Sequence, residues 1–275
     1  MTSSESMLNI TRSNCWLQLA LLLLMPQLSQ AQDNLQTVQE IRNRGELRVA
    51  SVAEPLYPFS VLKQGRWSGY EVELAQLVAD SIGVKLVWDA SYRDTAELID
   101  SLKQHKTDLA FAHIKRDLAT AQKVNFTLPY IALDFVIVTN RLKVIEKKPA
   151  NEMLLSIGQL PLRIGTIDIP TYRSMASIRF PRAKIETFSN ISSLTAALES
   201  GKIDALFCDE VEARNIFADQ PQRGLHLGYF ALPELRNEVV AMVDWPDTHF
   251  VSWLNLVLEP VAGTTTIDQL FLKNY

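Results

Sequence analysis

The chain has 275 residues, of which 47% are hydrophobic and 21% are charged, so it is long enough to bury a sizeable core. This length corresponds to one large domain or two small ones. The formal net charge is −4, which argues against nucleic acid as a partner and indicates a non-basic surface.

The N-terminal region carries an apolar run at Trp16–Met25. This run is too short to span a bilayer, because a membrane helix needs about 20 apolar residues. Small residues ending at Ala31 are typical of a signal-peptidase site, so we expect residues 1–31 to be a cleaved signal peptide. Met7 offers an alternative start to Met1. An anchor that stays attached is the other interpretation.

The first half of the remaining chain alternates short apolar strands with amphipathic helices. Gly65 and Gly69 mark a hairpin-like turn, and Gly83 ends a helix whose apolar face includes Leu74 and Val78. The pattern predicts strands at Leu47–Val52, Val84–Trp88 and Leu109–Ala112, and a helix around Ala96–Leu102.

The second half repeats this pattern. The segment LRIGTIDIPTY at Leu162–Tyr172 matches LRVASVAEPLY at Leu47–Tyr57, and LTAALESGKIDALFCD at Leu194–Asp209 matches LIDSLKQHKTDLAFAH at Leu98–His113. Gly201 stands where a glycine would end the second of these helices. Each half therefore reads as a strand–helix–strand unit with a largely parallel sheet.

The C-terminal part adds three elements. A strand is predicted at Glu238–Trp245, a helix at Thr248–Val261 and a short terminal helix after it. Two similar α/β lobes suggest a ligand cleft between them, because open α/β sheets bind ligands at the C-terminal ends of their strands.

Several features exclude other kinds of chemistry. The sequence has no G-x-S-x-G, H-E-x-x-H, Walker or Rossmann motif, so we expect no catalytic residues and no enzyme activity. Its four histidines show no metal-like spacing, so we expect neither a metal nor a cofactor. Cys15 lies in the expected signal peptide, which leaves Cys208 as a lone, buried cysteine that cannot form an internal disulfide.

Taken in order, seven segments carry a family resemblance. They are ELRVASVAEPLYPFS, GYEVELAQLVADSIGVKL, LIDSLKQHKTDLAFA, KVNFTLPY, LRIGTIDIPTY, ALESGKIDALFCDEVEARNIF and FVSWLNLVLEPV. With this order and spacing the chain resembles the periplasmic solute-binding proteins of the polar amino-acid type, the family-3 substrate-binding proteins of ABC importers.

The resemblance implies a type II periplasmic-binding-protein-like fold, with two α/β lobes joined by two crossover strands. Lobe 1 would comprise residues 45–136 and 237–275, and lobe 2 residues 140–229. It also implies a periplasmic monomer that captures a small polar ligand, an amino acid or a related compound, and delivers it to the membrane subunits of an importer.

The resemblance assigns three ligand contacts. Tyr57 takes the place of the aromatic residue that covers the ligand side chain, and Thr171 that of the threonine that donates to the ligand carboxylate. Asp209 takes the place of the aspartate that accepts from the ligand ammonium, although it could instead simply cap the helix that follows.

The largest departure from the family lies in AHIKRDLATAQKVNFTLPY, Ala112–Tyr130. Thr120 stands where the family has the arginine that clamps the ligand carboxylate. We expect His113, Lys115, Arg116 and Thr120 to line this altered side of the cleft. Arg116 could equally belong to a solvated turn.

Three interpretations of this departure stay open. Lys115 or Arg116 supplies the positive charge from a shifted position, or the ligand lacks an amino-acid carboxylate, or the site has decayed. The alternative functions are accordingly an exported enzyme of the same fold, similar to cyclohexadienyl dehydratase, and a sensing or partner-binding module with a degenerate site. Conversion of prephenate or arogenate by the purified protein would identify the enzyme.

Overall fold

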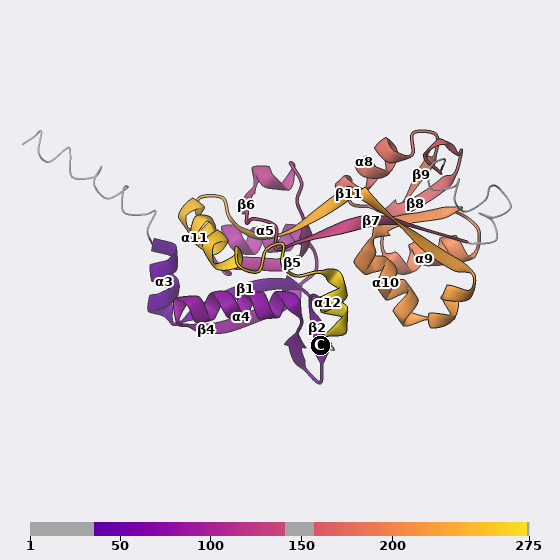
Figure 1. The fold of residues 1–275 in the computed structure, drawn as a ribbon. Helices are drawn as coiled ribbons and strands as arrows, with labels where there is room; N and C mark the ends of the chain where they lie inside the picture. The colour runs from indigo at the N-terminus through magenta and orange to yellow at the C-terminus, as the bar shows by residue number, and fades with distance from the viewer. Residues whose placement is uncertain (1–35, 141–156, 274) are drawn as a thin grey trace, which may run out of the picture.

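The computed structural model describes residues 36–140, 157–273 and 275. The expected signal peptide, residues 1–31, lies outside these described residues. Two bodies of helices and strands stand side by side and are connected by the long strands β7 (Ile131–Asn140) and β11 (Leu227–Asp244), as Figure 1 shows. These are the two crossover strands of the expected two-lobe α/β fold.

Lobe 1 is built from the N-terminal third of the chain and the C-terminal segment. Its strands other than the crossovers are β1 (Glu46–Val52), β2 (Val61–Lys63), β3 (Arg66–Ser68), β4 (Lys85–Tyr92), β5 (Leu109–Lys115) and β6 (Val124–Phe126). Its helices are α3 (Gln36–Arg44), α4 (Tyr70–Ile82), α5 (Thr95–Lys103), the 3-10 turn η2 (Thr120–Gln122), α11 (Thr248–Leu258) and α12 (Ile267–Leu272).

Lobe 2 contains the remaining elements. Its strands other than the crossovers are β8 (Arg163–Ile167), β9 (Lys184–Phe188) and β10 (Ala205–Asp209). Its helices are α8 (Pro170–Arg179), α9 (Ile191–Glu199) and α10 (Glu210–Asp219), with 3-10 turns η3 (Ile157–Gln159) and η4 (Pro221–Leu225).

One sheet passes through both lobes. Its strand order is β4-β1-β5-β11-β7-β10-β8-β9, and β6 also pairs with β11. Within lobe 1, β1 pairs in parallel with β4 and β5, and within lobe 2, β8 pairs in parallel with β9 and β10. The repeat seen in the sequence is thus a repeat of topology, with β1–α5–β5 corresponding to β8–α9–β10.

The two faces of the lobe 1 sheet pack different helices. Along β11, Val239, Ala241 and Val243 join the cluster that includes α4 and α11, while Val240 and Met242 join the cluster that includes α5. This alternation follows from the two-residue period of a strand, which sends successive side chains to opposite faces. A separate cluster between Phe135 and Leu232 forms the core of lobe 2.

Local signals in the sequence set several element ends. Gly83 and Gly201 both adopt positive φ after helices, which is the left-handed conformation that glycine adopts at little cost. Asp94 and Asn190 begin α5 and α9 by accepting a backbone hydrogen bond from the first turn of each helix. The helix predicted at Thr248–Val261 ends slightly earlier, at Leu258.

The pairing of the two crossover strands is irregular where the chain passes between the lobes. Pairing between β7 and β11 shifts between Leu232, which pairs with Phe135, and Arg236, which pairs with Asp134. Three residues of β11 (233–235) therefore bulge out where the chain passes from one lobe to the other.

Candidate ligand-binding site

A cavity of about 550 Å³ lies between the lobes and is lined by residues from both. This volume is within the range of small-molecule sites, which is roughly 300–1,000 Å³. Lobe 1 contributes Val52, Glu54, Pro55, Leu56, Thr95, residues 112–115, Asp117, Ala119 and Thr120, and lobe 2 contributes residues 167–170, residues 189–191 and Glu212.

The parallel strands explain why these residues meet. Val52, Lys115 and Ile167 are the last residues of β1, β5 and β8, and each lines the cavity. Carboxyl ends of parallel strands lie at one edge of a sheet, and here the edges of both lobes face each other. The cavity therefore occupies the position at which this kind of fold binds ligands.

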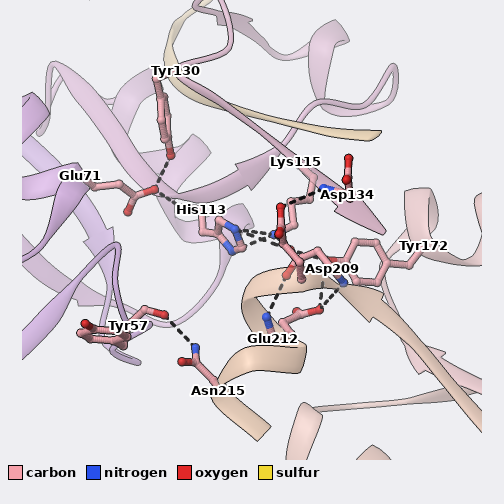
Figure 2. A network of polar contacts seen from close by, with 11 residues as sticks. Tyr57, Glu71, His113, Lys115, Tyr130, Asp134, Tyr172, Asp209, Glu212 and Asn215 are labelled. Carbon is pink, nitrogen blue, oxygen red and sulfur yellow. Dashed lines mark hydrogen bonds and ion pairs between the residues drawn. The ribbon is translucent and has the colours of Figure 1, made fainter. Parts of the chain in front are cut away.

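An ion pair connects the lobes beside this cavity. Lys115 Nζ of β5 donates to Asp209 Oδ2 of β10 at 2.8 Å (Figure 2). The Lys115 side chain is 7% exposed and that of Asp209 is fully buried. Because both charges are withdrawn from water, each depends on the other for compensation.

Asp209 has further partners within lobe 2. The Tyr172 hydroxyl donates to Asp209 Oδ2 at 2.8 Å, and the Glu212 backbone N–H donates to Oδ1 at 3.0 Å. The Glu212 carboxylate accepts in turn from the Asp209 backbone N–H, which completes a capping box at the start of α10. Asp209 thus caps a helix and pairs with Lys115 at the same time.

His113 lies between the two lobes with its ring next to Lys115. Its Nδ1 atom is 2.7 Å from Lys115 Nζ, and its Nε2 atom is 3.6 Å from Asp209 Oδ2. The ring stacks on Phe59 with 4.4 Å between centroids. His113 has a φ of 50°, an uncommon left-handed conformation for a residue other than glycine.

A buried carboxylate holds this conformation in place. The His113 backbone N–H donates to Glu71 Oε1 at 2.6 Å, and the Tyr130 hydroxyl donates to the same oxygen. Glu71 is fully buried in α4, and its second oxygen, Oε2, has no hydrogen-bond partner among the described residues. Figure 2 shows that this group and the Lys115–Asp209 group form one network through His113.

The network perturbs the pKa values of its acids and bases. Burial, reinforced by the charge of Lys115, lowers the pKa of His113 to about 3, so the imidazole is neutral. Burial works to raise the pKa of Asp209, but the charge of Lys115, the neighbouring His113 and the hydrogen bonds from Lys115 and the Glu212 backbone together hold that pKa well below its usual range. A neutral His113 can accept a hydrogen bond from Lys115 Nζ at its Nδ1 atom.

Two glutamates shift in the opposite direction. Burial, together with the charge of Asp209, raises the pKa of Glu212 to about 8. Burial raises the pKa of Glu71 to about 7, although hydrogen bonds from Tyr130 and His113 oppose the shift. Glu212 therefore contributes a mostly protonated carboxyl to the cavity wall at neutral pH.

Among the predicted contacts, His113, Lys115 and Thr120 line the cavity. Asp209 lies directly behind Lys115. Thr120 lies in η2, where its backbone N–H donates to Asp117 Oδ1 at 2.9 Å.

The other three predicted contacts are not among the residues that line this cavity. The Tyr57 ring packs edge-on against Phe271 of α12, with centroids 5.2 Å apart, and its hydroxyl donates to the Phe271 carbonyl. Arg116 points to solvent and pairs with Glu238 at 2.8 Å, as a residue of a solvated turn does. Thr171 lies in the first turn of α8, beside Pro170, which does line the cavity.

Four members of the network, Glu71, Tyr130, Tyr172 and Glu212, were not predicted as site residues. In the sequence, Tyr172 repeats Tyr57, and Glu71 and Glu212 lie in segments expected to be helices. Asp209 and Glu212 do have the spacing of a capping box, which is the one local signal that could have placed Glu212. For Glu71 no local signal exists, because its burial depends on Tyr130, 59 positions away.

A second set of contacts joins the lobes away from the cavity. Asn215 of α10 donates to the Tyr57 carbonyl at 2.8 Å, and Arg214 pairs with Asp268 of α12 at 2.5 Å. Val211, at the start of α10, packs into the lobe 1 cluster. Helix α10 therefore contacts lobe 1 at several points away from the cavity.

Within the described ranges, no three His, Cys, Asp or Glu side chains are grouped so that they could hold a metal ion. No helix in the same ranges has the length and apolar character needed to cross a membrane. Cys208 is fully buried in β10, where burial raises the pKa of its thiol.

Residues 47–273 match the family of bacterial extracellular solute-binding proteins, family 3. A membrane-bound lytic murein transglycosylase F from Serratia proteamaculans is 28% identical over 67% of this chain, which spans only 37% of that relative's length. A probable histidine-binding protein from Neisseria gonorrhoeae is 22% identical over 83% of this chain and 82% of its own length. A cyclohexadienyl dehydratase from Pseudomonas aeruginosa is 27% identical, covering 67% of this chain and 66% of its own.

The fold also matches solved structures. The structure of an ancestral cationic amino acid solute binding protein superimposes with a TM-score of 0.64 at 25% identity, covering 86% of this chain and 99% of that one. The likeness extends over both lobes.

Proposed function

Because this chain belongs to the bacterial extracellular solute-binding proteins, family 3, we propose that it captures a small polar ligand, an amino acid or a related compound, in the cavity between its lobes. The observation that carries this proposal is the cavity of about 550 Å³, which is lined by the carboxyl ends of strands from both lobes. Closure of the lobes around such a ligand would occur by hinge motion at the crossover strands.

The relatives support an amino acid as the first class to test. One relative is named as a probable histidine-binding protein, and one structural neighbour as a cationic amino acid binding protein. The cavity is suited to a small compound with both polar and apolar parts. Its wall combines Glu54, Asp117 and Asp168 with apolar side chains such as Ile167 and Ile191.

The cellular setting is part of the same proposal. Residues 1–31 act as a signal peptide that directs the protein to the periplasm and is then cleaved. The mature protein acts as a monomer and delivers its ligand to the membrane subunits of an ABC importer. Lobe 1 comprises residues 45–136 and 237–275 together with the preceding helix α3, and lobe 2 comprises residues 140–229. The family description, which names extracellular solute-binding proteins, supports an exported protein.

A thermal-shift screen tests the proposal directly. A ligand that binds only the folded state raises the melting temperature, so the purified protein should be screened against amino acids, small dicarboxylates, amines and opines. Calorimetry then gives the affinity of each hit. If no compound of these classes stabilises the protein, the proposal is wrong.

A pair of matched variants locates the hit. Thr120 and Gln122 lie in the same 3-10 turn, but only Thr120 lines the cavity. A tryptophan at Thr120 should fill part of the cavity and abolish binding, while Gln122→Trp should bind as the wild type does. Equal loss in both variants would place the ligand elsewhere.

A second candidate function is lyase-type catalysis, because one relative is a cyclohexadienyl dehydratase. Glu212 favours it, since a carboxyl with a pKa of about 8 that lines a cavity can donate a proton near neutral pH. Turnover of a cyclohexadienyl substrate, measured with wild type and Glu212→Gln, decides between the two functions. Activity that is present in the wild type and lost in the variant would establish the enzyme.

A further inference from the structure

The carboxylate of Asp209 is fully buried and accepts hydrogen bonds from three donors of the protein itself. Its Oδ2 atom accepts from Lys115 Nζ and from the Tyr172 hydroxyl, each at 2.8 Å, and its Oδ1 atom accepts from the Glu212 backbone N–H. His113 Nε2 approaches Oδ2 to 3.6 Å, and Asp209 is fully buried. Figure 2 shows these groups surrounding Asp209.

The partner from lobe 1 has the same chemistry as the ammonium group of an amino acid. Lys115 brings a primary ammonium to a buried carboxylate, which is the geometry of a charge-assisted hydrogen bond. Because Lys115 is part of the chain, it reaches Asp209 without the entropy that a free ligand loses on binding. A free ammonium would have to displace Lys115 and leave that side chain, which is 7% exposed, without its counter-charge.

We propose that Lys115 is a resident counter-ion of Asp209 and a specificity-determining residue of the cleft. It occupies the position at Asp209 that a ligand ammonium would need, so this protein recognises its ligand without using an α-ammonium group. This inference rests on the proposed function and specifies which group of the ligand contacts the cavity wall at Lys115.

The charges of the side chains that line the cavity define which ligand group can contact Lys115. Among the described residues that line the cavity, Lys115 is the only lysine or arginine, and its charge is matched by Asp209. An ammonium group has three N–H donors, and Lys115 uses them toward Asp209 and His113, which leaves one. The ligand group at this wall is therefore a hydroxyl, carbonyl or carboxylate oxygen that accepts from Lys115.

Chemical rescue tests the role of Lys115 without a known ligand. Lys115→Ala removes a propylammonium-sized group and leaves Asp209 without its Lys115 partner. The melting temperature of this variant should therefore be lower than that of the wild type. Propylammonium chloride should raise that temperature saturably toward the wild-type value, because the free cation replaces the missing side chain. Propanol, which has the same shape without the charge, and sodium chloride at equal ionic strength should not.

The double variant Lys115→Ala/Asp209→Asn removes both charges and serves as the control. Propylammonium should not raise its melting temperature more than propanol or sodium chloride does. If Lys115→Ala does not fold alone, the yield of folded protein on dilution from denaturant, in propylammonium against propanol, gives the same comparison. Equal effects of propylammonium and propanol on Lys115→Ala would overturn the proposal.

Matched ligands test specificity. L-Histidine and imidazole-lactate differ only in an α-ammonium replaced by a hydroxyl, so calorimetry with both probes isolates that group. In wild type the two dissociation constants should agree within about threefold, whereas Lys115→Ala should prefer histidine by about tenfold or more. A wild-type preference for histidine of about tenfold would overturn the proposal. If neither probe binds, the amino acid found in the thermal-shift screen and its α-hydroxy analogue replace them in the same comparison, and the rescue experiment decides the role of Lys115 in either case.

Discussion

The hydroxyl of Tyr172 donates to the oxygen of Asp209 that also accepts a hydrogen bond from Lys115 Nζ. Tyr172 corresponds to Tyr57 in the repeat, yet Tyr57 packs against Phe271 at the edge of lobe 1. Two equivalent positions thus serve different purposes: one supports the buried ion pair, and the other packs the C-terminal helix.

Replacing Tyr172 by phenylalanine should destabilise the protein by about 1.5–3 kcal/mol, the range for a hydrogen bond to a charged group. The ring remains, so packing against Phe135 is kept and the loss reports the hydroxyl alone. Urea unfolding measures the change. Tyr229→Phe is the control, because that tyrosine is 43% exposed and should change stability by less than about 0.5 kcal/mol. Equal effects of the two variants would contradict the role of the hydroxyl.

Stability should fall as the pH rises from about 4.5 to about 8, most steeply between about pH 6.5 and 7, where the neutral His113 no longer opposes the loss. The pKa of Glu212 is raised to about 8 and that of Glu71 to about 7, so the folded protein keeps protons that the unfolded chain has already lost. The slope is at most about 1.4 kcal/mol per pH unit for each group and ends once the pH exceeds its folded pKa. Denaturant unfolding at a series of pH values measures it.

Glu212→Gln provides the matching control for this pH dependence. Glutamine keeps the size and a hydrogen-bonding oxygen but cannot titrate, so the decline above pH 7 should become shallower. Below about pH 4.5, where the glutamates of the unfolded chain are protonated as well, stability should rise with pH in both proteins, because the pKa of His113 is lowered to about 3 and the unfolded chain binds the extra proton there. An unchanged decline in the variant would show that Glu212 ionises normally.

Gly69→Ala should be strongly destabilising, by about 1–3 kcal/mol for the strained backbone and more for the clash. Gly69 has a φ of 118°, and a Cβ atom there would lie 2.3 Å from the Phe59 carbonyl oxygen. Gly224→Ala is the control, since a Cβ atom at Gly224 meets nothing within 4 Å. Thermal unfolding should separate the two variants clearly, and similar melting temperatures would contradict the close approach of Gly69 to the Phe59 loop.

Asn215→Ala should shift the protein toward an open arrangement of its lobes. The variant loses the hydrogen bond to the Tyr57 carbonyl, and about 1 kcal/mol corresponds to about a fivefold change in the ratio of closed to open forms. Small-angle X-ray scattering should report a larger radius of gyration than for Asn43→Ala, which alters an exposed residue of α3 within lobe 1. Identical scattering of both variants would show that this contact does not hold the lobes together.

Much of the fold follows from local patterns in the sequence. Apolar residues at helical spacing and helix-ending glycines predicted α4, α5, α9 and α11, and short apolar runs predicted β1, β4 and β5, because these signals depend on neighbours along the chain. The repeat predicted the correspondence of β1–α5–β5 with β8–α9–β10.

The site was harder to predict for a physical reason. Burial of Lys115 beside Asp209 depends on how two lobes meet, with 94 positions between the two residues, and no local pattern encodes such a pairing. The sequence placed both residues near the cleft but assigned Asp209 to a ligand. The family resemblance also assigns Tyr57 to the ligand, which stays a prediction, and its ring packs against Phe271.

The course of the chain through the two lobes affects how the protein is made. The lobe 2 cluster comes from one continuous stretch between Phe135 and Leu232, whereas the lobe 1 cluster needs Val239, Phe250 and Leu270 from the C-terminal segment. A ribosome releases the first β-strands of lobe 1 long before these partners exist, so lobe 2 is the first unit that can complete its core. The nascent chain must therefore keep the apolar surface of β1 and α4 from aggregating until synthesis is nearly finished, a natural task for a chaperone.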